Sequence, residues 1–310
     1  MNAPATALHG WAAGEAGRPA SPDWTIPQHW ERYTPEEHAT WATLFRRQMA
    51  LLPGRACAAF LDGMRRLPIE PDRIPHFDAL SEVLMRHTGW QVVAVPGLVP
   101  DDVFFDHLAH RRFPAGQFIR RADQLDYLQE PDVFHDVFGH VPMLLNPVMA
   151  DFIQAYGEGG LRAQRLGALE MLARVYWYTV EFGLVREDGG LRIFGAGIVS
   201  SAAESVFCLD STSPNRIAFA LPRVMRTRYR IDDFQQTYFV LDRLDDLLRL
   251  ADIDFAPLYE QVRALEPLAP DAVQPDDEVI THGDGHYHRA RGLYTRSPIQ
   301  TRSAGARPAL

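Results

Sequence analysis

Two histidines five residues apart, His135 and His140, are the side chains in this sequence most suited to binding a metal ion. They lie in the segment QEPDVFHDVFGHVPM, among apolar residues and beside two aspartates. Neutral imidazole is a strong ligand for first-row divalent metals. On a regular α-helix five residues turn the chain about 500°, so the two rings would not share a face. Gly139 allows the helix to distort or end, which would let the rings converge.

Glu181 is the best candidate for a third ligand, because it is the one carboxylate in the apolar segment VYWYTVEFG. Burying an unpaired carboxylate is costly, so the sequence implies a cationic partner. Two neutral imidazoles and one carboxylate form the facial triad of non-haem iron(II) enzymes, which leaves coordination positions open for oxygen and substrate. The zinc-protease pattern H-E-x-x-H is not matched, because the histidine spacing is five and the residue after His135 is an aspartate.

Three other interpretations stay open on spacing alone. The histidines could be ordinary core or surface groups, with Glu181 paired to Arg174 or Arg186. The same three ligands could serve a zinc hydrolase, although that enzyme would need a nearby general base. A fold of this type could also persist as a non-catalytic binding protein.

The elements that must position these residues are mainly helical. Periodicity, capping residues and breakers predict helices at about 34–52, 55–66, 75–87, 100–110, 146–157, 161–185, 201–209, 239–250 and 255–265, with one more carrying His135. Short strands are expected at 91–95, 116–120 and 191–194. The predicted fold class is mainly α with a few short β-strands, in a single catalytic domain spanning 23–267. We expect a flexible N-terminal arm at 1–22 and a disordered C-terminal tail at 268–310.

Composition narrows the class of protein further. The chain has 310 residues, 46% of them hydrophobic, and a net charge of -9 with both signs interspersed. This argues against a nucleic-acid-binding surface. No apolar run reaches the ~18 residues of a membrane span, and the N-terminus is a poor signal peptide. Two distant cysteines, Cys57 and Cys208, suit a reducing compartment, so we expect a cytoplasmic protein.

Three motifs in register resemble the pterin-dependent aromatic amino acid hydroxylases: QEPDVFHDVFGHVPML, VYWYTVEFGLV and FGAGIVSSAAESVFCL. The likeness continues upstream in TGWQVVAVPGLVPDDVFFDHLAHRRFPAGQFIR and downstream in YRIDDFQQTYFVLDRLDDL. It covers about residues 25 to 260 and is greatest to the short bacterial phenylalanine 4-hydroxylases, since the N-terminal regulatory domain of the animal enzymes would not fit in this chain.

The resemblance implies Fe(2+) held by His135, His140 and Glu181. It also implies a tetrahydropterin cosubstrate bound by Gly97, Leu98, Phe104, Asp136 and Tyr176, and an amino acid bound by Arg120, Trp177, Ser200 and Ser201. From spacing alone, Phe104 would be an ordinary core residue and Arg120 a surface arginine. Animal relatives carry glutamate at the position of Asp136, and animal phenylalanine hydroxylases carry threonine at that of Leu128.

The substrate expected from the resemblance is L-phenylalanine, converted to L-tyrosine with dioxygen and reduced pterin as the first step of phenylalanine catabolism. Trp177 resembles the phenylalanine and tyrosine enzymes, and Ile231 offers no polar partner to a phenol hydroxyl. Animal relatives tetramerise through a C-terminal helix with apolar heptads, which this tail lacks, so we expect a monomer. The tail histidines His282, His286 and His288 are expected to be solvated.

Overall fold

The fold is mainly α-helical with a few short strands, as predicted, in a computed structural model that describes residues 21–126 and 130–293. The α-helices of the described residues are α1 (Pro35–Leu51), α2 (Ala58–Arg66), α3 (Phe77–His87), α4 (Asp101–Ala109), α5 (Pro147–Arg165), α6 (Leu169–Tyr176), α7 (Ala196–Val199), α8 (Ala202–Asp210), α9 (Leu221–Arg226), α10 (Asp246–Ala251), α11 (Phe255–Arg263) and α12 (His286–Ala290). Two further segments, Phe134–His140 and Trp177–Glu181, are π-helical.

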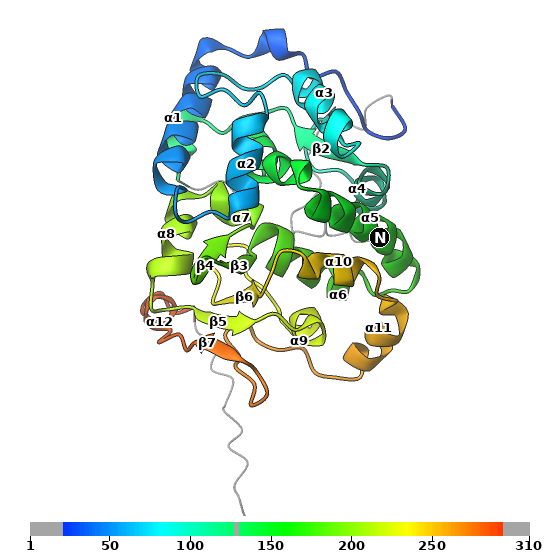
Figure 1. Ribbon diagram of the computed structural model, residues 1–310, viewed down its shortest axis with the longest axis vertical. Coiled ribbons are helices and arrows are strands. Elements are labelled where there is room, and N and C mark those ends of the chain that lie inside the picture. The colour runs from blue at the N-terminus through cyan, green and yellow to red at the C-terminus, as the bar shows by residue number, and fades with distance from the viewer. Residues whose placement is uncertain (1–20, 127–129, 294–310) are drawn as a thin grey trace, which may run out of the picture.

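Two separate sheets complete the fold. Strands β1 (Gln91–Val95) and β2 (Arg112–Gly116) form a parallel pair. The second sheet has the order β4-β3-β6-β5-β7, from β4 (Gly190–Ile193), β3 (Leu184–Glu187), β6 (Thr237–Leu241), β5 (Asn215–Ala218) and β7 (Val279–Thr281). Figure 1 shows this sheet in the lower half of the molecule, with α1, α2 and α3 in the upper half.

Helix α1 confirms the N-terminal helix predicted from capping residues. The Thr34 hydroxyl accepts a hydrogen bond from the backbone N–H of Glu37, and the Glu37 carboxylate accepts one from the backbone N–H of Thr34. This reciprocal pair satisfies two donors that a helix start otherwise leaves unpaired. Trp41, fully buried, then places the inner face of α1 in the core.

Helix α5 continues to Arg165, so the predicted end near Gly157 is wrong. The glycines there serve packing rather than termination. A Cβ on Gly160 would lie 1.9 Å from the Phe105 ring, and one on Gly157 would lie 2.3 Å from the Ala109 backbone nitrogen. Both glycines therefore allow α5 to lie directly against α4, which forms one wall of the site described below.

The single helix predicted over 161–185 is also wrong, because the chain breaks twice within it. Helix α5 ends at Arg165 and Gly167 adopts a left-handed φ of +60°, which only glycine takes at little cost. Helix α6 then leads into the π-helical segment Trp177–Glu181, and β3 begins at Leu184. The apolar stretch from Leu169 to Val185 is therefore a helix followed by the start of a strand. Periodicity alone cannot distinguish a buried strand from a buried helical segment.

Two predicted elements are misplaced. The strand expected at 116–120 lies earlier, as β2, because residues 112–116 are the ones that align with β1. The helix expected at 239–250 begins only at Asp246, as α10, because Thr237–Leu241 forms the central strand β6. All five residues of β6 are buried, so its sequence shows no alternation of apolar and polar residues.

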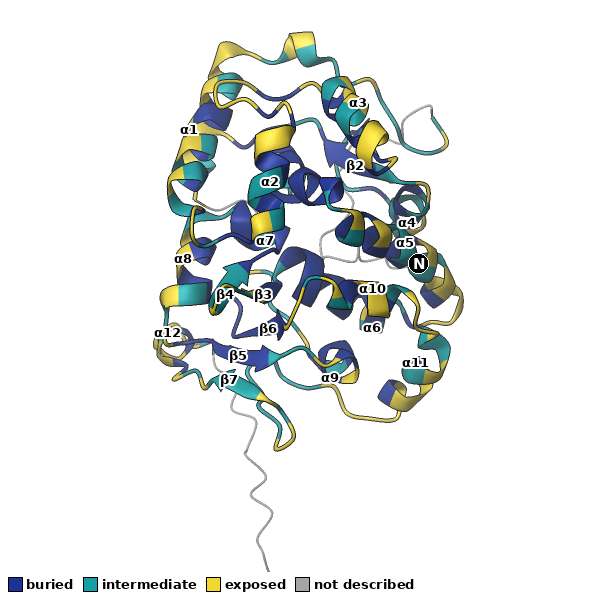
Figure 2. Cartoon of the chain, in the orientation of Figure 1, coloured by how far each residue is buried: buried dark blue, intermediate teal, exposed yellow. Residues whose placement is uncertain are grey.

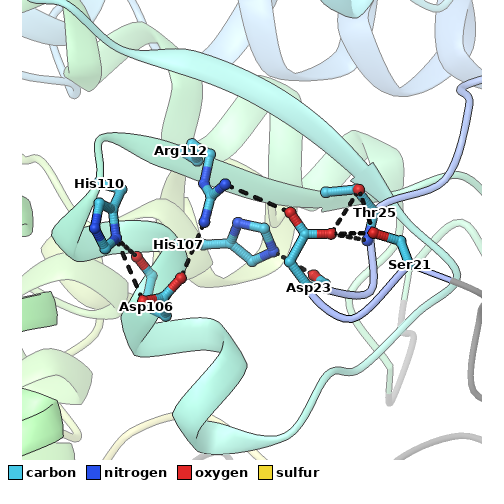
Figure 3. A network of polar contacts seen from close by, with 7 residues as sticks. All are labelled: Ser21, Asp23, Thr25, Asp106, His107, His110 and Arg112. Atoms are coloured by element: carbon cyan, nitrogen blue, oxygen red, sulfur yellow. Dashed lines mark hydrogen bonds and ion pairs between the residues drawn. The ribbon is translucent and has the colours of Figure 1, made fainter.

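The N-terminal segment is anchored through Asp23, near the predicted boundary of the arm. Figure 3 shows the Asp23 carboxylate between Thr25, which donates its hydroxyl to it, and Arg112 of β2. The ring Nε2 of His107, on α4, lies 2.8 Å from the Asp23 carbonyl oxygen. These contacts hold residues 21–25 against α4 and β2. Residues 1–20 of the arm predicted over 1–22 lie outside the described part of the chain.

The prediction of a disordered tail is wrong for residues 268–293. Strand β7 pairs antiparallel with β5, and α12 packs beyond it at the lower left of Figure 1. His288 is buried, with its Nε2 2.9 Å from the carbonyl oxygen of Phe234, so it is not the solvated residue we expected. The long-range contacts that order this segment come from residues more than thirty positions earlier, so local composition does not reveal them. Residues 294–310 lie outside the described part.

The core is continuous through the centre of the molecule. Figure 2 shows buried residues concentrated on strands β2, β5 and β6 and on the inner helices, with exposed residues on the outer helical surfaces. Large side chains with almost no exposure include Trp41, Trp90, Tyr178, Tyr238 and Phe138. Within residues 21–126 and 130–293, no helix has both the length and the apolar character needed to cross a membrane.

Candidate metal centre and adjoining cavity

The π-helical segment Phe134–His140 explains how two histidines five residues apart converge. A π-helix is hydrogen-bonded from residue i to i+5, so residues at that spacing lie nearly above one another. The Nε2 atoms of His135 and His140 are 3.2 Å apart. Glycine suits position 139, because a Cβ there would make a tight contact of 3.0 Å with the carbonyl oxygen of Ala196. A spacing unsuitable for an α-helix is therefore the correct one for this segment.

Glu181 completes the group from the end of the second π-helical segment. One of its carboxylate oxygens lies 3.2 Å from Nε2 of His140, and the other lies 3.6 Å from Nε2 of His135. Arg174 and Arg186, the alternative partners considered from the sequence, pair instead with Glu170 and Asp242. Among the described residues, His135, His140 and Glu181 are the group of three that can offer converging ligand atoms, all within 4.8 Å of one another.

Ser200 determines which nitrogen of His135 faces the other two ligands. Its hydroxyl donates to the carbonyl oxygen of Ala196 at 2.7 Å, so toward His135 it acts as an acceptor. Nδ1 of His135, 3.0 Å away, therefore carries the proton, and Nε2 presents a lone pair. Burial lowers the pKa of His135 to about 4, which keeps the ring neutral at pH 7. A neutral ring with its lone pair aimed at Glu181 and His140 is the form that binds a metal.

The donor set fits a first-row divalent cation. Imidazole and carboxylate bonds to such ions are roughly 2.0–2.2 Å long, so neighbouring ligand atoms at right angles lie about 3 Å apart. The separations of 3.2 Å here are close to this value. Nδ1 of His140 is buried with no hydrogen-bond partner among the described residues. The nitrogen of this ring that faces the other two ligands is therefore Nε2. Two neutral nitrogens and one carboxylate leave room for further ligands on the open side.

The metal group lies on the wall of a cavity of about 490 Å³, the size of a small-molecule site. All the residues that the sequence analysis assigned to metal, pterin or amino acid line this one cavity: Gly97, Leu98, Phe104, Arg120, His135, Asp136, His140, Tyr176, Trp177, Glu181, Ser200 and Ser201. Ile231 lines it as well. Leu128 lies outside the described residues. The structure thus brings together side chains contributed by segments more than a hundred residues apart.

Arg120 is held in the cavity wall by Asp132. Its Nε and Nη2 lie 2.8 and 2.9 Å from the two carboxylate oxygens, and its backbone N–H donates to the same carboxylate. Asp132 is fully buried, and Arg120 is 8% exposed. Nη1 reaches the Leu125 carbonyl oxygen at 3.4 Å. These contacts leave one N–H on each of Nη1 and Nη2, the pair of donors that can bind a second carboxylate bidentately.

Aromatic rings form the remaining walls. Tyr176 lies parallel to the His140 ring, with centroids 6.3 Å apart, and its edge meets Phe104 at 6.1 Å. Trp177 stacks on Tyr229 at 4.2 Å with an interplanar angle of 14°. Planar, apolar ring faces along the cavity that carries the metal group are suited to binding flat aromatic molecules.

Asp136 faces the cavity beside the metal ligands but has a partner of its own. Its Oδ2 accepts a hydrogen bond from the Gly116 backbone N–H at 2.8 Å. Burial raises the pKa of the Asp136 carboxyl to about 7. The contact fixes the carboxyl at the end of β2.

Sequence reasoning missed several residues of the cavity wall. It suggests for Asp132 no more than a shaping of the pocket, and for Glu204 only a capping box. The Ser201 hydroxyl does accept from the Glu204 backbone N–H, but the Glu204 carboxylate points elsewhere, accepting from Tyr238 and from the Gln235 backbone N–H. The cavity is also lined by Asp233, Gln235, Tyr287 and Arg291. A signal for Glu204 is present, since it is the one charged residue in AAESVFCL.

The Glu204 carboxyl is expected to make stability depend on pH. Burial raises its pKa from 4.5 to about 7. The folded chain therefore binds the proton more tightly than the unfolded chain, so the stabilisation is complete below pH 4.5 and is lost as pH rises to about 7. Glu204→Gln keeps the acceptor oxygen and removes the titration. The free energy of unfolding of the variant, relative to the parent, should rise by roughly 3 kcal/mol from pH 4.5 to 8. Urea unfolding of both proteins across this range measures it, and parallel pH profiles would contradict it.

Comparison with known proteins agrees with this site. Residues 25–255 match the family model described as biopterin-dependent aromatic amino acid hydroxylase. The phenylalanine-4-hydroxylase of Chromobacterium violaceum is 60% identical over 262 residues, covering 84% of this chain and 88% of that protein. The one from Ralstonia nicotianae is 61% identical over 273 residues, covering 88% and 87%.

Solved structures give the same result. The iron- and phenylalanine-bound crystal structure of the Chromobacterium violaceum phenylalanine hydroxylase superposes with a TM-score of 0.81 at 57% identity, covering 84% of this chain and 95% of that one. The cobalt-bound structure of the same enzyme gives 0.82 at 60% identity, covering 83% and 93%. The family match, the identities and the superposed fold together show that this chain belongs to the biopterin-dependent aromatic amino acid hydroxylases.

Proposed function

We propose that this chain is a phenylalanine 4-monooxygenase, which converts L-phenylalanine to L-tyrosine with dioxygen, Fe(2+) and a tetrahydropterin. The observation that carries the proposal is that His135, His140 and Glu181 line one cavity together with an arginine and several aromatic rings. The phenylalanine-4-hydroxylases at 60% identity, and the iron- and phenylalanine-bound structure of one of them, support it.

The two histidines and Glu181 would hold the iron, and the bound iron and pterin together supply the activation of dioxygen. The other residues orient the organic molecules. Gly97, Leu98, Phe104, Asp136 and Tyr176 are assigned to the pterin. Phe104 and Tyr176 offer ring faces, and the carboxyl of Asp136 offers a polar contact from the end of β2.

The amino acid is assigned to Arg120, Trp177, Ser200 and Ser201. Arg120 binds its carboxylate through the two N–H groups that Asp132 and Leu125 do not use, so Asp132 keeps the guanidinium in one orientation. Trp177 lies four residues before Glu181 and packs the substrate ring near the metal. Ser200 serves indirectly, since it keeps the proton of His135 on Nδ1.

Phenylalanine is favoured over other aromatic amino acids by the side chains around the ring. Trp177 and Ile231 both line the cavity, and neither Ile231 nor the face of an indole offers a partner for a phenol hydroxyl. The preference is a matter of degree, because an apolar pocket rejects an added hydroxyl only weakly. We further place the protein in the cytoplasm as a monomer acting in the first step of phenylalanine catabolism.

The test is an assay of the iron(II)-reconstituted protein with tetrahydrobiopterin, dioxygen and L-phenylalanine. We expect tyrosine in proportion to the phenylalanine consumed, at a lower KM than for tryptophan. Absence of tyrosine, with iron fully loaded and the pterin intact, would contradict the proposal. Ester or amide hydrolysis by the zinc-loaded protein would favour a metallohydrolase instead.

A further inference from the structure

Gln235 makes a buried contact with Trp177 that the sequence analysis did not anticipate. The indole Nε1–H of Trp177 donates to the side-chain oxygen of Gln235 at 2.9 Å. The side-chain nitrogen of Gln235 donates in turn to the carbonyl oxygen of Arg230 at 2.8 Å. Gln235 is only 2% exposed and lines the cavity. Its amide therefore connects an aromatic wall of the cavity to the backbone of the 230–235 loop.

The amide of Gln235 has one workable orientation. If it were rotated by 180°, its NH₂ group would face the indole N–H, two donors opposite each other. Its oxygen would then face the Arg230 carbonyl, two acceptors opposite each other. Because the contact with the indole is buried and the one with Arg230 is partly buried, either mismatch would leave polar groups unsatisfied. The position of the indole nitrogen is thus tied to the position of residue 230.

The backbone of Gln235 is itself fixed from behind. Its N–H donates to the Glu204 carboxylate, which also accepts from the Tyr238 hydroxyl. On the other side, α12 holds the loop: the Tyr287 hydroxyl donates to Asp233 at 2.9 Å. The loop that contains Ile231 is therefore anchored at Asp233 and at Gln235. Because the Gln235 side chain is bonded to the indole, the anchored loop also restrains Trp177.

We propose that Gln235 is a positioning residue, which sets the plane of Trp177 against the ring of the bound aromatic amino acid. This rests on the assignment of Trp177 to the substrate under the proposed function. The Trp177 ring is packed against Tyr229 and Phe182, with centroid distances of 4.2 and 4.7 Å, and its N–H is bonded to Gln235. The hydrogen bond adds a directional restraint to this packing, and Gln235 makes it without touching the metal ligands. It should control substrate affinity and the fraction of pterin oxidation that yields tyrosine, and leave iron binding unchanged.

The chain provides a matched control in the next residue. Gln236 is also buried, at 4% exposure, and its side-chain nitrogen has no partner among the described residues. It does not line the cavity. Gln→Met at either position removes one buried amide of the same size. The loss of the two Gln235 contacts should raise the KM for phenylalanine about tenfold, whereas Gln236→Met should leave that KM unchanged.

The experiment compares the holoenzyme, Gln235→Met and Gln236→Met by KM and kcat for phenylalanine, tyrosine formed per pterin oxidised, iron content and Tm. We expect Gln235→Met alone to raise KM and lower the tyrosine yield, with full iron content in all three. Equal KM in the two variants would overturn the proposal. An inactive parent protein would instead contradict the proposed function, so the two failures are distinguishable.

A double-mutant cycle tests whether Gln235 acts through Trp177. Trp177→Phe keeps an aromatic ring and removes the N–H. In that background Gln235→Met should change KM less than about twofold, because the contact has already been lost. Additive effects would show that Gln235 acts by another route and would overturn the proposal. If Gln235→Met does not fold, Gln235→Glu replaces it in both comparisons. The glutamate keeps an acceptor for the indole N–H but places a carboxylate oxygen opposite the Arg230 carbonyl. A KM equal to that of the parent would then count against Gln235 as a positioning residue.

Discussion

Replacing Glu181 by alanine is expected to remove the metal and with it all formation of tyrosine. Glu181 supplies the carboxylate of the group and the one negative charge among its three ligands. Without it, two neutral imidazoles remain for the cation. Because loss of a mere outer partner of a ligand can lower metal affinity 10–100-fold, loss of a ligand should lower iron affinity by more than about 100-fold. Iron content after gel filtration and tyrosine formation at saturating substrate measure the two effects.

Glu170→Ala is the control for this variant. Glu170 belongs to α6, the helix that leads to Glu181, but its side chain is 81% exposed and pairs with Arg174. Removing it should leave iron content and activity close to those of the parent. Retained iron and activity in Glu181→Ala would exclude Glu181 from the metal site, and equal losses in both variants would indicate a general disturbance of the helix.

Arg120→Lys is expected to weaken phenylalanine binding strongly while leaving the metal in place. The guanidinium serves Asp132 with two of its N–H groups and has a second pair for the substrate carboxylate. A lysine ammonium lacks this planar fork, so it cannot hold both carboxylates in the same geometry. Hydrogen bonds to charged groups contribute about 1.5–3 kcal/mol, so KM for phenylalanine should rise roughly 10- to 150-fold.

The adjacent arginine provides the comparison. Arg121 is exposed and pairs with Asp123 on the surface, so Arg121→Lys should leave KM unchanged. In Arg120→Lys the positive charge is retained and keeps Asp132 paired, which avoids the larger destabilisation of an unpaired buried carboxylate. An Arg120→Lys variant with the KM of the parent would remove Arg120 from the substrate site, whatever its stability.

The metal group shows how far residue types alone could lead. Histidine and glutamate in apolar segments are rare enough to suggest a cation, and this reasoning identified His135, His140 and Glu181. The separation of five between the histidines has no explanation from regular helical geometry. The spacing depends on a π-helical turn, in which Gly139 packs closely against Ala196. No local propensity of the sequence predicts such a turn.

The parts that could not be predicted depend on distant contacts. Strand β6 is mistaken for a helix in the sequence because burial on both faces removes the alternation by which strands are recognised. The tail has the polar composition of a disordered segment, yet β7 and α12 are ordered by contacts with Arg216, Asp233 and Phe234. Gln235 resembles any polar residue of a loop until the indole of Trp177 is seen beside it.

The wall formed by α12 has a consequence for the order of events during synthesis. The three metal ligands are translated well before α12, which follows Glu181 by roughly a hundred residues, or about 5–20 s at the usual rate of a ribosome. The side of the cavity formed by Tyr287 and Arg291 is therefore the last part of the site to be synthesised. A chain that ends before residue 286 has His135, His140 and Glu181 but lacks this side of the cavity.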